Sequence, residues 1–174
     1  MKNEHRQLVL DIENSFSRRI LPKGRIIDLS IDLDKNLEAQ RVSSFCRNSL
    51  FNDENSSSHV AFHYLTCDAA ISMLPKYMSN IIENYNEENF INDVIIDVLC
   101  SGMPMSHKDY YNNLGVKLKS LMNEKEISCV CQFISVMIER EHSNNLYSIS
   151  QELMAANYLW CQNHNVKILY YVEK

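Results

Sequence analysis

The segment NEKEISCVCQFISVMIER, residues 123–140, gives the clearest indication of the fold. Asn123 followed three residues later by Glu126 is typical of a capping box, in which both side chains satisfy free amides at a helix N-terminus. Beyond this pair, apolar residues recur at helical spacing along one face: Ile127, Val130, Cys131, Ile134 and Ile138. We therefore predict a helix over 123–140 with that face against a core.

Helical spacing of apolar residues continues in both directions from this segment. It predicts further helices over about residues 4–19, 34–48, 67–73, 75–85, 86–99 and 149–162. Thr66 is a good N-cap, Pro75 either kinks its helix or starts the next one, and Ser148 with Gln151 repeats the capping signal. Cys131 is expected to face the core and Cys129 to point elsewhere. Trp160 is expected to be buried against the 123–140 and 86–99 helices.

The scarcity of turn-forming residues supports a helical fold. Only three glycines and three prolines occur in 174 residues, whereas β-rich folds recruit both for their many tight turns. The predicted fold class is all-α: a single domain over residues 1–174, forming an irregular bundle of about six or seven helices. Residues 26–31 and 166–172 either pair as two short strands, or 166–172 packs as a C-terminal extension.

Composition and motifs favour a binding protein over an enzyme. The chain has 17 Lys and Arg against 22 Asp and Glu, a formal net charge of −5, which argues against a nucleic-acid partner. Glycine clusters, nucleophile elbows and the His-Glu-x-x-His zinc motif are absent from the sequence. We therefore expect no catalytic residues, no metal and no cofactor. The remaining metal candidate is His59 with His63, extended by Cys67, for which two surface histidines are the competing interpretation.

Six cysteines raise the question of disulfides. The N-terminal residues are charged and lead into an amphipathic run without a signal-type apolar stretch. No apolar segment approaches the roughly 20 residues that span a bilayer. We therefore expect a cytoplasmic protein with reduced thiols and no membrane partner.

Charge patterning suggests a partner-binding surface. Lys and Arg are absent between Lys76 and Lys108, a segment that carries five acids, and Ile96 falls on the same predicted helix face as two of them. Aromatic residues flank the segment, as in many recognition surfaces. The predicted partner-binding residues are Glu83, Glu87, Glu88, Asp93, Ile96, Asp97, Tyr110 and Tyr111. The competing interpretation is a solvated acidic face with an incidental isoleucine.

Residues 62–78 resemble the central motif of an uncharacterised family of small helical bacterial proteins. The pattern consists of Phe62, Leu65-Thr66, Ala69 and then Leu74-Pro75 with Tyr77-Met78. The resemblance implies helices that meet at a proline.

In size, acidity and Asn- and Ser-rich composition, the whole chain is similar to helical immunity proteins of contact-dependent growth inhibition systems. That resemblance implies a cognate toxin partner, basic and of nuclease type, which the chain binds and neutralises. The alternative is a helical regulator or a homo-oligomeric interaction module without a toxin partner; a hydrolase or metal-dependent enzyme using His59 and His63 ranks third.

Overall fold

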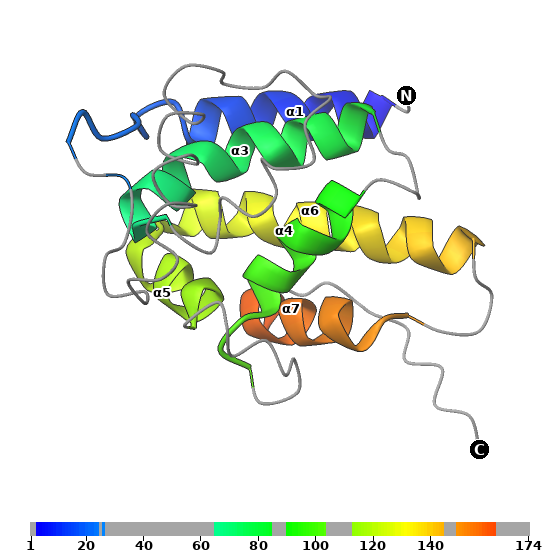
Figure 1. Cartoon of the computed structure of the whole chain (residues 1–174). Coiled ribbons are helices and arrows are strands. Elements are labelled where there is room, and N and C mark those ends of the chain that lie inside the picture. The colour runs from blue at the N-terminus through cyan, green and yellow to red at the C-terminus, as the bar shows by residue number, and fades with distance from the viewer. Residues whose placement is uncertain are drawn as a thin grey trace.

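A computed structural model of the chain describes residues 3–24, 26, 65–84, 90–103, 113–144 and 149–162. Within these ranges the fold is all-α, as the sequence predicts (Figure 1). The helices are α1 (Asn3–Ser15), α3 (Cys67–Glu83), α4 (Phe90–Cys100), α5 (Leu114–Leu121), α6 (Glu124–Asn144) and α7 (Gln151–Cys161). The helix predicted over 34–48 and the segments 27–31 and 166–172 lie outside the described residues. The carbonyl of Ile26 accepts a hydrogen bond from the Thr66 N–H at 2.9 Å.

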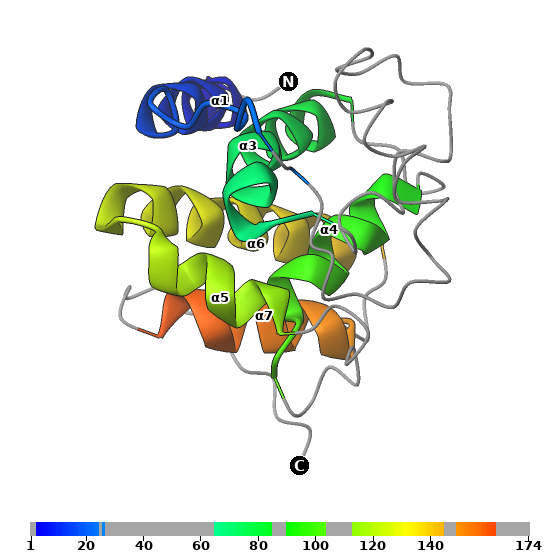
Figure 2. The ribbon, with the colours of Figure 1, turned by 60° about the vertical axis from the view of Figure 1, so that its left-hand side comes forward.

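The longest helix, α6, organises the bundle. It contacts α1 and α3 on one side and α7 on the other, while α4 packs against α3, α5 and α7 (Figures 1 and 2). At one end of the bundle α1 terminates, α3 and α6 begin, and α5 lies beside them. At the opposite end α3 and α6 terminate and α4 and α7 begin. The two ends therefore carry separate sets of side chains.

The predicted capping box at the start of α6 is confirmed. Asn123 Oδ1 accepts the backbone N–H groups of Lys125 at 2.9 Å and Glu126 at 3.1 Å, and Glu126 Oε2 accepts the Asn123 N–H at 2.8 Å. The prediction that Cys129 points away from the core is wrong. Its side chain is buried and its thiol donates to Ser15 Oγ at 3.4 Å, because α1 packs against that side of α6.

Pro75 lies inside α3, so the helices predicted over 67–73 and 75–85 form one continuous helix of 17 residues. Thr66 caps it, its hydroxyl accepting the Ala69 N–H at 3.4 Å. Burial of most of the residues on both sides of the proline compensates for the hydrogen bond that a proline cannot donate.

The helix α5, which the sequence pattern does not predict, packs against the C-terminus of α4. Gly102, with φ of +90°, ends α4 in a left-handed conformation that favours glycine. A Cβ on Gly115 would lie 2.6 Å from the Val98 carbonyl oxygen, so only glycine permits this approach. The Gly115 N–H donates to Ser101 Oγ at 2.6 Å and fixes the contact.

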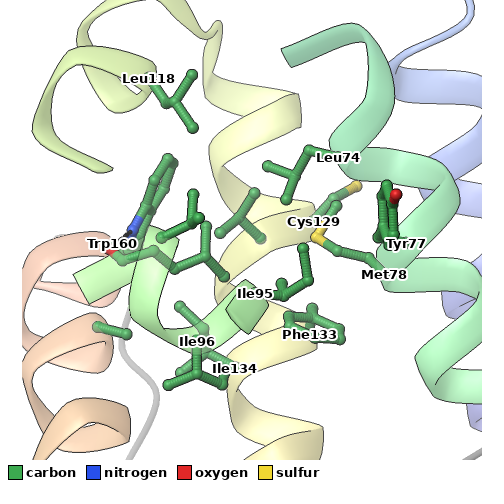
Figure 3. Close-up of a cluster of buried hydrophobic side chains, with 14 of the residues drawn as sticks. Leu74, Tyr77, Met78, Ile95, Ile96, Leu118, Cys129, Phe133, Ile134 and Trp160 are labelled. Carbon is green, nitrogen blue, oxygen red and sulfur yellow. Dashed lines mark hydrogen bonds between the residues drawn. The ribbon is translucent and has the colours of Figure 1, made fainter. Parts of the chain in front are cut away.

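The core confirms the predicted burial of Trp160, which is 1% exposed. Its indole N–H donates to the Leu99 carbonyl oxygen at 2.8 Å, so α7 is joined to the end of α4 (Figure 3). Ser150 caps α7, and its hydroxyl accepts the Leu153 N–H at 3.3 Å. The sequence pattern predicts Ser148 in this role, a residue that lies outside the described ranges.

Cys131 on α6 and Cys161 on α7 form a disulfide, with their Cα atoms 5.3 Å apart. The expectation of reduced thiols is therefore not met at this pair. Cys131 faces the core as predicted, and the antiparallel packing of α6 and α7 places Cys161 opposite it.

Candidate functional site

The structure places the predicted partner-binding acids on two helices. Glu83 is exposed at the last residue of α3, Asp93 is exposed on the first turn of α4, and Asp97 is half-buried one turn later. α3 and α4 pack against each other, so the helices that carry these carboxylates are neighbours. The other predicted positions lie outside the described residues: Glu87, Glu88, Tyr110 and Tyr111.

The assignment of Ile96 to the partner-binding surface is wrong. Its side chain is 7% exposed and lies beside Ile134 of α6 in the core (Figure 3). α4 is covered by α3 on one side and by α7 on another, so its buried arc is wider than the stripe of one-sided helices. Ile96 therefore contributes to packing and not to a contact surface.

Arg140 brings the end of α6 to the end of α3. Its guanidinium donates to the carbonyl oxygens of Ile81 at 2.9 Å and Ile82 at 2.7 Å, two acceptors that the last turn of a helix leaves without amide partners. Glu139, the residue before Arg140, is exposed. The two hydrogen bonds therefore place the exposed carboxylate of Glu139 at the same end of the bundle as Glu83.

At the same end of the bundle, Glu141 joins α6 to the start of α7. Its carboxylate oxygens accept the Ser150 N–H at 3.0 Å and the Ser150 hydroxyl at 3.3 Å. Glu152, half-buried, follows in the first turn of α7. We define the acidic surface as the exposed or half-buried carboxylates in the last turns of α3 and α6, on α4, and in the first turn of α7: Glu83, Asp93, Asp97, Glu139 and Glu152.

This arrangement can attract and hold a cationic group. Arg140 and Glu141 join α6 to α3 and to the start of α7, so the helices that carry Glu83, Glu139 and Glu152 are fixed to one another before a partner arrives. In the described ranges, no three His, Cys, Asp or Glu side chains are grouped to hold a metal ion. His59 and His63 lie outside those ranges. None of the helices described is both long and apolar enough to cross a membrane.

Sequence reasoning missed Glu139 and Glu152 as members of this surface. They lie at the end of one predicted helix and the start of the next, 42 or more residues beyond the acidic segment that ends at Asp97. The available signal was that α6 and α7 are consecutive helices. Because they pack antiparallel, the end of α6 and the start of α7 lie at the same end of the bundle. A charge count within one segment does not contain that information.

No protein-family model, curated protein or solved structure matches this chain. The resemblances noted in the sequence therefore stay predictions.

Proposed function

We propose that the chain is an immunity protein that binds a basic bacterial toxin domain through the acidic surface and neutralises it. The observation that carries the proposal is the set of exposed or half-buried carboxylates on α3, α4, α6 and α7, neighbouring helices of which α3, α6 and α7 are joined by the Arg140 and Glu141 hydrogen bonds. The sequence-level similarity to immunity proteins of contact-dependent growth inhibition systems supports it.

Charge complementarity gives the physical basis for this choice of partner. A nuclease toxin grips nucleic-acid phosphates with Lys and Arg, so its substrate-binding surface is basic. An acidic protein is steered toward such a surface and can cover it, which excludes the phosphates. The net charge of −5 adds to the attraction at long range.

The test is a binding measurement with the product of the gene immediately upstream of this one, because immunity genes lie next to their toxin genes. We expect the association rate to fall at least tenfold between about 50 and 500 mM salt, since salt screens exposed charges. We expect Glu83→Lys/Asp93→Lys to slow association by a similar factor and to leave the melting temperature nearly unchanged, because both side chains are exposed.

A matched control is Asp11→Lys/Glu13→Lys on α1, which changes the net charge equally at a site away from the acidic surface. Equal slowing by both double variants would show that the association rate depends on net charge and not on the acidic surface. The absence of any complex, together with self-association of the chain, would favour the homo-oligomeric interaction module instead.

A further inference from the structure

The buried face of α7 offers little large apolar surface. Two of its buried residues, Leu153 and Trp160, are large and apolar, and the others are small or polar: Ala155, Ala156, Asn157 and Cys161. The buried face of α3, by contrast, is made largely of Ile, Leu, Met and Tyr side chains. Burial of apolar area is the main force that holds a helix in a bundle, so packing holds α7 less firmly than α3.

Asn157 weakens the docking of α7 further. Its side chain is 7% exposed, and its Oδ1 accepts no hydrogen bond from the described residues. A buried carbonyl oxygen that has lost its water partners without gaining a donor disfavours the docked position of the helix. Contacts near the ends of α7 compensate for this. Glu141 binds Ser150 at the start, and the disulfide to Cys131 holds Cys161, the last residue of the helix.

The position of α7 allows it to separate from the bundle without disrupting the other helices. It packs mainly against α6 and α4, on the side of α6 away from α1 (Figures 1 and 2). The contacts of α1 with α3 and α6, and those of α4 with α3 and α5, do not involve α7. Folded proteins open locally in such units, at a frequency set by the contacts that each unit makes. A covalent bond from the end of α7 to α6 restricts this opening.

Burial of the disulfide makes its oxidised and reduced states long-lived. Cys131 is 1% exposed and Cys161 6%. A thiolate must reach one of the two sulfur atoms to break the bond by exchange. A reductant therefore reaches the bond only during fluctuations that lift this end of α7, and exchange is slow. In the cytoplasm, the compartment that the sequence predicts, disulfides are usually transient and serve catalysis or redox sensing.

We propose that the Cys131–Cys161 bond is a redox-controlled lock on α7. In the oxidised protein the bond holds α7 on α6, and in the reduced protein α7 opens as a unit while the other described helices keep their packing. For reduction, one thiolate of a dithiol attacks a sulfur of the bond, and its second thiolate then releases the protein. The products are two protein thiols and one reductant disulfide. Reoxidation is the reverse exchange with oxidised glutathione, which leaves as two glutathione thiols.

The lock is independent of the proposed function, because its operation needs no toxin partner. Its effect differs from a general loss of stability, since one helix opens while the remainder stays folded. α7 carries Glu152, so its opening would also move one carboxylate of the acidic surface away from the others.

Cys129 and Cys131 provide an internal comparison. They lie two residues apart on α6, but Cys129 is buried where its thiol donates to Ser15 Oγ at the end of α1, and Cys131 is buried against α7. Opening of α7 uncovers Cys131 and leaves Cys129 covered, whereas global unfolding uncovers both. The measurement is the rate at which iodoacetamide modifies each thiol of the full chain under native conditions, after reduction with dithiothreitol and removal of the reductant. Tandem mass spectrometry resolves the thiols, and each rate is divided by that of the same thiol in the urea-unfolded chain.

We expect Cys131 and Cys161 of the reduced protein to react at least about tenfold faster than Cys129, and oxidised glutathione to restore their protection. Asn157→Leu removes the unpaired oxygen at similar volume, so it should slow the reaction of Cys131 at least about threefold and leave Cys129 unchanged. Tyr158→Leu, at an exposed position of the same helix, is the matched control and should change neither rate. Equal rates for Cys131 and Cys129, an unreactive Cys131 in the reduced protein, or a lasting loss of protection after oxidised glutathione would each overturn the lock.

Discussion

The guanidinium of Arg19 and the carboxylate of Glu126 form a bidentate ion pair, 2.6 and 2.7 Å long, between the segment after α1 and the first turn of α6. The Glu126 side chain is 2% exposed and that of Arg19 29%. Glu126 also accepts the Asn123 N–H, so one carboxylate closes the capping box and anchors a distant segment. The pair therefore couples helix initiation to tertiary packing.

Arg19→Met should lower the free energy of unfolding by roughly 2–4 kcal/mol, because it leaves a buried carboxylate without its counter-charge. Arg19→Met/Glu126→Gln should lose less than the sum of the two single variants, since glutamine retains the capping role and carries no charge. Urea unfolding of the four proteins measures this coupling. Strict additivity would contradict the pairing.

The same pair predicts a specific dependence of stability on pH. Burial raises the pKa of Glu126, but the hydrogen bonds from Arg19 and from the Asn123 N–H outweigh it, so the pKa lies below its usual value. A carboxyl with a lowered pKa in the folded state stabilises the fold above its unfolded pKa of about 4.3. That contribution is lost as the pH falls through the lower folded value. Unfolding free energy should decline less steeply below about pH 4.3 in Glu126→Gln than in the parent.

Trp160 connects α7 to α4 through its buried ring and its hydrogen bond to the Leu99 carbonyl oxygen. Trp160→Ala should reduce the free energy of unfolding by roughly 3–5 kcal/mol, as for other large core aromatics. Trp160→Phe keeps most of the apolar volume, loses the hydrogen bond, and should cost less. Tyr158→Ala on the same helix is the control, since Tyr158 is 55% exposed. Comparable losses in Trp160→Ala and Tyr158→Ala would contradict the described core.

The Cys131–Cys161 disulfide closes a loop between residues separated by 30 positions. Its removal should cost about 3–4 kcal/mol, because the unfolded chain regains conformational freedom. A reducing agent should lower the melting temperature of the parent and leave that of Cys131→Ala/Cys161→Ala unchanged. A parent protein that melts at the same temperature with and without the reducing agent would show that the bond contributes nothing.

Two substitutions at Ile96 test whether its side chain packs in the core or contacts a partner. Ile96→Asp places a charge in the core between α4 and α6 and should cost more than about 3 kcal/mol. Ile96→Val, the conservative control, should cost about 0.5–1.5 kcal/mol. Thermal melting of both measures the difference. A stable Ile96→Asp protein would show that the side chain of residue 96 lies on the surface and not in the core.

Local sequence signals predicted much of the fold. The capping box of Asn123 and Glu126, the Thr66 cap and the apolar stripe of the 123–140 helix are all present in the structure. These features depend on residues three or four positions apart, which the sequence displays directly. α5 was missed because it is only eight residues long and depends on the Gly115 approach to α4, a contact between helices.

Less of the candidate site than of the fold could be predicted from the sequence. Glu83 and Asp93 were found because they belong to one acidic segment, and both are exposed. Ile96 was misplaced because a single helix does not reveal how many neighbours cover it. Glu139 joins the surface through the Arg140 hydrogen bonds to α3, which depend on packing between segments far apart in the chain.

The most direct test of the account is growth of bacteria that express the toxin encoded upstream, with this chain supplied in trans. The parent and the Asp11→Lys/Glu13→Lys control should restore growth, and a triple variant of the acidic surface, Glu83→Lys/Asp93→Lys/Glu139→Lys, should fail although it melts near the parental temperature. Full protection by the folded triple variant would contradict the assignment of the acidic surface as the toxin-binding site. Failure of the parent chain itself to protect would contradict the immunity function.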